Sequence, residues 1–212
     1  MSADKPMFTV YIVDDDPGVI KALERRLRVK GYDTLSFTST DDFLRGHDAA
    51  VPGCVILDLS MPGMNGLELQ QALTSQGSQR PVIFLTGNGD IPTSVRAMRA
   101  GAVDFLTKPV NDESFLGAIR RAEEQDRDTR QTRDETADTT GRLATLTPRE
   151  HEVLTHVVAG RLNKQIAVDL GTAVQTIKVH RRRAMEKLGA TSIVHLMRLL
   201  EKIDISKPSS GN

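Results

Sequence analysis

The chain has 212 residues, which is enough for one or two domains with a buried core. Its 28 Lys and Arg residues balance its 28 Asp and Glu residues, but the charges are divided unevenly along the chain. Residues 1–142 carry 17 basic and 22 acidic side chains, whereas residues 143–212 carry 11 and 6. This distribution indicates nucleic acid as a partner of the C-terminal part alone.

Cysteine content and hydropathy exclude several classes of protein. Cys54 is the only cysteine and lies in an apolar run, so an internal disulfide or a cysteine-based zinc site is excluded. No apolar run approaches the roughly 20 residues of a membrane span, and residues 1–6 lack the apolar segment of a signal peptide. The sequence therefore predicts a soluble protein of the cytoplasm without a membrane partner.

Residues 7–121 alternate short apolar runs with amphipathic stretches five times. The expected strands are residues 8–13, 35–37, 54–57, 82–85 and 103–107. The expected helices are residues 17–30, a short one at 41–44, and three more that carry Leu67 to Leu73, Val95 and Met98, and Phe115 to Ile119. Five such units with short connections predict an α/β fold with a doubly wound, five-stranded parallel sheet.

Charged residues follow three of these strands, at the point where each strand ends. Asp14 and Asp15 follow the first strand, Asp58 follows the third, and Lys108 follows the fifth. Because ligands collect beyond the carboxyl ends of parallel strands, we expect these side chains to meet at one edge. Clustered carboxylates need a cation such as Mg²⁺, and a lysine beside them can receive a phosphoryl group. The pattern predicts a site at which an aspartate is phosphorylated.

Each of these residues also has an ordinary explanation when it is taken alone. Asp16 followed by Pro17 is a common helix start, and we expect Asp16 to cap the helix. Asp14 and Asp15 could form a turn, and Lys108 could be a solvated strand end. It is their occurrence together, at the ends of alternate strands, that favours the phosphate site.

Four segments at these strand ends resemble the receiver domain of two-component response regulators. They are residues 13–16, 56–63, 85–87 and 105–109, and the resemblance spans roughly residues 7–121. It implies a flavodoxin-like strand order and a receiver domain over residues 7–122. It also implies that Asp58 is the phosphoacceptor, attacking as a carboxylate nucleophile.

The resemblance assigns the remaining roles at this edge. Asp15, Asp58 and the backbone carbonyl of Ser60 would ligate Mg²⁺ directly, while Asp14 would act through water. Thr86 would offer its hydroxyl to a phosphate oxygen, and Phe105 would turn inward as Thr86 moves. Lys108 would complete the catalytic set, and Lys108-Pro109 would be a cis peptide. Gly87 would leave room for the phosphate, and Ser60 and Asn88 would tune its lifetime.

Residues 123–142 contain no large apolar side chain, but seven acids and four arginines. Such a stretch cannot bury an apolar face, so we interpret it as a charged, solvated linker. The pairs Glu123–Arg127 and Asp126–Arg130 have the i,i+4 spacing that supports a helix. They predict that the first half of the linker extends the preceding helix.

The C-terminal part is predicted to be all-α with four helices. Thr147, Pro148 and Glu150 predict a capped helix start, and further helices are expected at residues 163–170, 174–188 and 191–203. A helix, a turn containing Gly171 and a cation-rich helix form a helix-turn-helix pattern. Residues 206–212 are expected to be disordered.

This part resembles the LuxR/FixJ-type DNA-binding domain through residues 146–150, 163–167, 176–180 and 187–189. The resemblance implies a DNA-binding domain at residues 143–205, with Lys178, Val179 and Arg182 contacting DNA from the recognition helix. Lys164, Arg181, Arg183 and Lys187 are further candidates for phosphate contacts.

Three positions in this part leave the assignment open. Many relatives have a serine at the position of Ala173, and Thr172 could cap the recognition helix instead. His180 is assigned a packing role rather than a DNA contact. The last helix carries Ile193, Leu196 and Leu200, which could belong to the core or to a dimer interface.

Together the two resemblances predict a phosphorylation-controlled transcription regulator of the FixJ/StyR-like group, and not an enzyme. The expected partners are a sensor histidine kinase, promoter DNA and RNA polymerase, with a homodimer forming on phosphorylation and slow self-dephosphorylation. An aspartyl-phosphate phosphatase is a weaker alternative, because Ser60 stands where such enzymes carry a second acid. A regulator that ignores phosphorylation is the other alternative.

Overall fold

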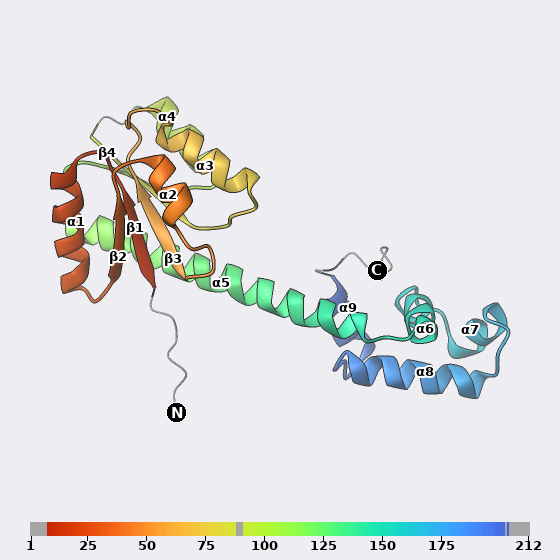
Figure 1. The fold of residues 1–212 in the computed structure, drawn as a ribbon. Helices are drawn as coiled ribbons and strands as arrows, with labels where there is room; N and C mark the ends of the chain where they lie inside the picture. Colours follow the sequence, from red (N-terminus) through yellow and green to blue (C-terminus); the bar gives the residue numbers. More distant parts are fainter. Residues whose placement is uncertain (1–7, 88–90, 202, 204–212) are drawn as a thin grey trace. The chain divides into compact units, whose positions relative to one another are not determined.

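The computed structural model describes residues 8–87, 91–201 and 203. The chain divides into two units, one ending at Arg130 and the other beginning at Gln131. The division lies within one long helix, α5 (Asp112–Ala144), shown in Figure 1.

The first unit contains a five-stranded sheet in which all neighbouring strands are parallel. The strand order is β2-β1-β3-β4-β5, which confirms the predicted flavodoxin-like order. The strands are β1 (Thr9–Val13), β2 (Asp33–Phe37), β3 (Gly53–Leu57), β4 (Val82–Thr86) and β5 (Asp104–Thr107). Every residue of β3 and β4 is buried, as expected of central strands that are covered on both faces.

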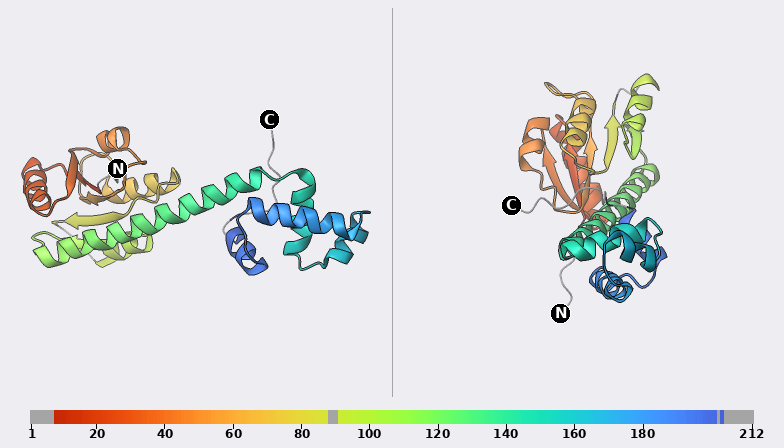
Figure 2. Two further views of the ribbon diagram at one scale, coloured as in Figure 1. Left: turned by 90° about the horizontal axis from the view of Figure 1, so that it is seen from below. Right: turned by 90° about the vertical axis from the view of Figure 1, so that its right-hand side faces the viewer.

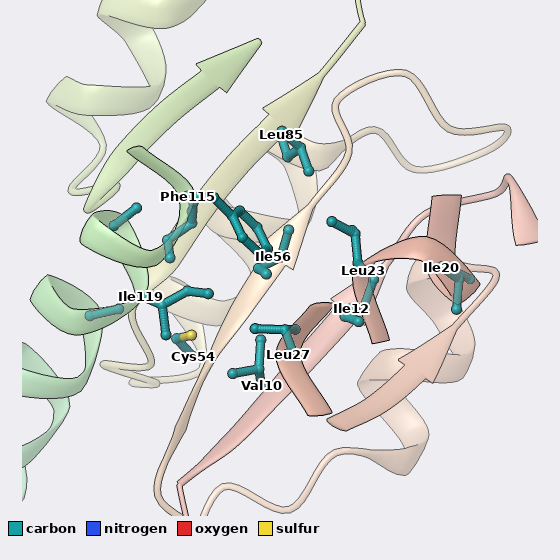
Figure 3. Packing of buried hydrophobic residues seen from close by; sticks show 13 residues of the cluster. Val10, Ile12, Ile20, Leu23, Leu27, Cys54, Ile56, Leu85, Phe115 and Ile119 are labelled. Atoms are coloured by element: carbon teal, nitrogen blue, oxygen red, sulfur yellow. The ribbon is translucent and has the colours of Figure 1, made fainter. Parts of the chain in front are cut away.

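Helices cover both faces of this sheet (Figures 1 and 2). One face packs against α1 (Pro17–Val29) and α5, and the other against α2 (Thr40–Gly46), α3 (Gly66–Ser75) and α4 (Ile91–Arg99). We call the apolar cluster under α1 and α5 the first core and the cluster under α2, α3 and α4 the second core. Successive side chains of β1 alternate between them, with Ile12 in the first core and Tyr11 in the second. Figure 3 shows strand residues of the first core facing Leu23 and Leu27 of α1 and Phe115 and Ile119 of α5.

Asp16 caps α1 as expected, since its side chain accepts a hydrogen bond from the amide of Gly18. The helix begins at Pro17, so the ordinary explanation for Asp16 is confirmed. The chain can therefore leave β1 and enter α1 within three residues, which keeps the preceding aspartates at the strand end.

Gly66 allows a close approach of α3 to the loop after β3. A Cβ atom at this position would lie 2.5 Å from the backbone oxygen of Asp58 and 3.1 Å from the ring of Phe84. We expect Gly66→Ala to lower the free energy of unfolding by about 1–3 kcal/mol, because backbone must move to accept the methyl group. Urea unfolding measures this, with Gly141→Ala as the control, since Gly141 has open space around it. Equal stability of the Gly66 variant and wild type would contradict the tight packing.

Helix α5 is longer than predicted. The sequence predicted helix over the first half of residues 123–142, whereas the helix continues to Ala144. The stretch is also not fully solvated, because Asp126 and Thr139 are 5% exposed. The predicted pair Asp126–Arg130 forms, with Arg130 Nε 2.9 Å from Asp126 Oδ2. This pairing makes the burial of Asp126 possible. No helix within the described residues is long and apolar enough to cross a membrane.

Within its described residues, the second unit contains four further helices, as predicted. They are α6 (Pro148–Val158), α7 (Asn163–Asp169), α8 (Val174–Lys187) and α9 (Ile193–Leu200). One apolar core holds them, with Leu154, Ile166, Ile177 and Leu196 contributed by successive helices. Thr147 and Glu150 form the predicted capping box of α6.

The start of α8 lacks a side-chain cap, so Thr172 does not take the place of the serine that many relatives have. The N-cap position is Ala173, and it makes no side-chain hydrogen bond to the helix. The amide of Thr172 instead donates to the carbonyl of Ala167, which closes the turn between α7 and α8. The prediction for residues 206–212 lies outside the described residues.

Candidate functional site

The structure brings Asp14, Asp58 and Lys108 together at the carboxyl end of the sheet. Lys108 Nζ lies 2.6 Å from Asp14 Oδ2 and 2.9 Å from Asp58 Oδ1. The two aspartates are only 3% and 6% exposed. Charged groups from the ends of β1, β3 and β5 therefore form one cluster, in which the two aspartates are buried and Lys108 is partly exposed.

Backbone hydrogen bonds fix both carboxylates. Asp58 Oδ2 accepts from the amide of Ser60 at 2.6 Å, and Asp14 Oδ1 accepts from the amide of Asp16 at 2.9 Å. Each carboxylate thus has one oxygen on a backbone amide and the other on Lys108. The strand ends are held in turn, because the amide of Asp58 donates to Val13 and that of Lys108 donates to Thr86.

The two aspartates also control the protonation of Lys108. Burial alone would lower the pKa of its ammonium group, but the hydrogen bonds that this group donates to Asp14 and Asp58 oppose this effect. The result is a pKa above the usual value for lysine. Lys108 is therefore a permanent cation between two carboxylates.

Asp15 follows the same strand but does not join the pair. Its side chain is exposed, whereas those of Asp14 and Asp58 are buried. Among the described residues, no group of three or more His, Cys, Asp or Glu side chains is arranged as a metal cluster. The donor chemistry nevertheless suits a hard cation, since the carboxylates of Asp14 and Asp58 lie together and Asp15 follows at the same strand end.

The residues expected to respond to phosphate lie beside this cluster. Thr86 ends β4 and is fully buried, and Phe105 in β5 is half-buried with its ring 6.2 Å from that of Phe84. Within the described part of the chain, nothing lies close to the position that a Cβ atom of Gly87 would take, as a position next to a new phosphate requires. The Lys108-Pro109 peptide is cis, as expected. Asn88 lies outside the described residues.

A basic surface follows the recognition helix α8 in the second unit. Lys178, Arg182 and Arg183 are exposed, and Lys164 on α7 is exposed as well. Lys178 and Arg182 are four residues apart, so they lie on one face of α8. Val179 and His180 are partly buried, and the Nδ1 atom of His180 is enclosed without a hydrogen-bond partner among the described residues.

Two of the candidate cations, Arg181 and Lys187, donate hydrogen bonds within the unit, and Arg182 forms an exposed ion pair with Glu186. Arg181 donates to Asn163 Oδ1 at 3.1 Å. Lys187 Nζ lies 2.6 Å from Glu150 Oε2 and 2.9 Å from the carbonyl of Thr145. These contacts favour a structural role for Lys187 over a contact with DNA, and sequence reasoning offered no signal for this pairing between α6 and α8.

The Lys187 pair predicts a specific acid sensitivity of the second unit. Hydrogen bonds from Lys187 and from the backbone of Thr147 lower the pKa of the Glu150 carboxyl from 4.5 to about 2. Because the folded-state pKa is depressed, this stabilisation is complete above about pH 4.5 and is lost as the pH falls towards 2.

We therefore expect the stability difference between wild type and Glu150→Gln to shrink between pH 5 and pH 2. Urea unfolding of the full chain, followed by hydrogen exchange of peptides from α6 and α8, measures it. Glu152→Gln is the control, since Glu152 makes an exposed pair with Arg149. A stability difference that stays constant with pH would contradict the pairing.

Comparison with known families and proteins identifies both units. Residues 10–120 match the family described as response regulator receiver domain, and residues 144–200 match bacterial regulatory proteins of the luxR family. The response regulator protein TodT of Pseudomonas putida is 41% identical over 194 residues, which are 92% of this chain and 86% of TodT. FixJ of Rhizobium meliloti, a transcriptional regulatory protein, is 41% identical over 192 residues, which are 91% of this chain and 94% of FixJ.

A solved structure of the response regulator StyR covers 93% of this chain and all of its own, with a TM-score of 0.81 and 41% identity. The receiver fold and the helix-turn-helix unit thus define a two-component response regulator that regulates transcription through DNA. More particularly, the chain belongs to the FixJ/StyR-like response regulators. The predicted family, fold class and function are confirmed.

Proposed function

We propose that Asp58 is the residue that accepts the phosphoryl group, from a sensor histidine kinase or a small phosphodonor. The observation that carries this assignment is the contact of Lys108 with Asp58 and Asp14 at the carboxyl end of the sheet. A carboxylate oxygen of Asp58 attacks phosphorus, the bond to the leaving group breaks, and an aspartyl phosphate remains.

The surrounding residues supply position and charge. Lys108 stays protonated between two carboxylates, so its ammonium group can balance charge on the phosphoryl oxygens. The amide of Ser60 orients the Asp58 carboxylate. Thr86 would give its hydroxyl to a phosphate oxygen, and Phe105 would follow its movement.

Asp58, Asp15 and the carbonyl of Ser60 would hold Mg²⁺, with Asp14 acting through water. A bound Mg²⁺ would supply positive charge that offsets repulsion between the carboxylates and the incoming phosphate. Asp15 follows β1 directly after Asp14, and its exposed carboxylate can supply a further oxygen ligand. Slow hydrolysis of the aspartyl phosphate would return the protein to its resting form, so that Asp58 serves as a timed switch.

The second unit would bind promoter DNA through α8. Lys178, Val179 and Arg182 are proposed as the primary contacts, with Lys164, Arg181, Arg183 and Lys187 as weaker candidates. The organisation proposed is a receiver at residues 7–122, a linker at 123–142 and a DNA-binding domain at 143–205.

Phosphorylation would favour a homodimer that binds two half-sites and acts on RNA polymerase in the cytoplasm. On α9, Ile193, Val194 and Met197 are exposed, which supports this helix as a candidate dimer surface.

The decisive experiment measures the size of the protein and its DNA affinity with and without beryllofluoride and Mg²⁺. The DNA is a duplex selected from random sequences with the beryllofluoride-treated protein. We expect dimerisation and tighter binding together, with an affinity that falls as salt rises. If neither size nor affinity changes, the protein does not use phosphorylation as proposed.

A further inference from the structure

The amino-terminal end of the sheet, opposite the phosphorylation site, carries a second network of charged residues. Its members are Asp126 and Arg130 of α5, Arg80 before β4, and the loop of residues 48–53 that leads into β3. Asp126 and Arg80 are 5% and 8% exposed, so both charges are buried. The proposed function does not use this network, and of its contacts only the pair of Asp126 with Arg130 was expected from the sequence.

Arg130 attaches α5 to the backbone of the loop. Its Nη1 atom donates to the carbonyl of Ala50 at 2.8 Å, and its Nη2 atom donates to Val51 at 2.7 Å and Ala49 at 3.2 Å. Its Nε atom donates to Asp126 Oδ2, which also accepts from the amide of Gly53 at 3.3 Å. We call Asp126 and Arg130, with these backbone contacts, the clamp.

Arg80 holds the same loop from the side of the sheet. Its Nη2 atom donates to the carbonyls of Asp48 at 2.7 Å and Val51 at 3.1 Å, and its guanidinium group lies 4.4 Å from the ring centre of Tyr11. The hydroxyl of Tyr11 also donates to Asp48, at 3.4 Å. The loop is therefore fixed to the sheet, and the clamp ties α5 to a firm support.

The clamp attaches residues 123–130 of α5 to the sheet. Residues 123–130 contain no large apolar side chain, so the burial of apolar surface cannot attach them. Charge-assisted hydrogen bonds are stronger than neutral ones, and the pairing of Asp126 with Arg130 avoids an unpaired buried charge. The division between the two units, between residues 130 and 131, coincides with the end of the clamped stretch.

The network also contacts the strands that carry the phosphorylation site. Gly53 begins β3, which ends at Asp58. Tyr11 lies in β1, which ends before Asp14, and Arg80 precedes β4, which ends at Thr86. The carboxyl ends of these three strands therefore lie at the phosphate site, and their amino-terminal parts lie at the network that holds the linker helix.

We propose that the clamp makes residues 123–130 of the proposed linker move with the receiver, so that the movable part of the linker begins at residue 131. This fixed stretch passes the state of the receiver to the DNA-binding unit, a step that rests on the proposed function. Loss of the clamp should leave phosphorylation intact while weakening its effect on DNA binding.

The test compares Arg130→Ala and Asp126→Asn with Arg133→Ala, whose arginine is exposed on the same helix. In the full-length protein, the amide hydrogen-exchange rates of residues 123–130 should rise about 10-fold or more in the two clamp variants, because charge-assisted hydrogen bonds are lost. Arg133→Ala should exchange like wild type. Unchanged exchange in both clamp variants would overturn the clamp.

The second arm measures phosphate uptake from acetyl phosphate and the ratio of DNA affinities with and without beryllofluoride. We expect normal uptake in the clamp variants but a ratio several-fold below that of wild type. Faster exchange with a wild-type ratio would show that the clamped stretch does not transmit the signal. If wild type binds DNA equally well with and without beryllofluoride, the proposed function fails. The hydrogen-exchange measurement still decides whether the clamp exists.

Discussion

Replacing Asp58 with asparagine is expected to abolish phosphate uptake from acetyl phosphate and, with it, the gain in DNA affinity. An amide cannot act as the carboxylate nucleophile, although it preserves the shape of the side chain that Lys108 and the Ser60 amide contact. Intact-protein mass spectrometry measures the uptake, and titration of labelled DNA measures the affinity. This change should have the largest effect of any single substitution.

Asp33→Asn is the matched control, because Asp33 is an exposed aspartate in the same unit. It should take up phosphate and respond like wild type. If Asp58→Asn still gains DNA affinity with acetyl phosphate, another residue accepts the phosphate or the protein responds to a different input.

Lys178→Ala should weaken binding to the selected DNA by roughly 10–100-fold while phosphate uptake stays normal. Lys178 is exposed on α8 and four residues from Arg182, where a recognition helix presents side chains to the major groove. Fluorescence anisotropy at several salt concentrations measures the affinity. A smaller salt dependence together with uniform weakening on all sequences would indicate a phosphate contact rather than a base contact.

Lys21→Ala controls for the loss of one positive charge, because Lys21 is exposed on α1 in the receiver. It should bind the selected DNA like wild type. Loss of both DNA binding and phosphate uptake in Lys178→Ala would indicate misfolding, and hydrogen exchange of the second unit would reveal it.

Patterns of apolar residues predicted most of the fold because burial imposes a period on each element. The alternation along β1 and the spacing of Leu23 and Leu27 in α1 follow from the faces that the sheet and the helix bury. The meeting of Asp58 with Lys108 was predictable for a related reason, since parallel strands bring their carboxyl ends to one edge.

The features that the sequence did not reveal depend on polar contacts between distant residues. The pairing of Lys187 with Glu150 joins residues that are 37 positions apart, and no periodic pattern records it. The helix beyond residue 132 carries no apolar stripe, so its pattern matched that of a solvated linker. The exposure of Asp15 beside the buried Asp14 also could not be read from two adjacent aspartates.

The position of the clamp matters for building hybrid regulators from this receiver. A fusion joined after residue 122 would omit Asp126 and Arg130, leaving the amide of Gly53 and the carbonyls of Ala49 and Ala50 without the partners they have here, and the carbonyl of Val51 with Arg80 alone. A junction after Arg130 would keep those partners and add only about two turns of native helix. The natural unit of exchange is therefore the receiver together with the first part of α5.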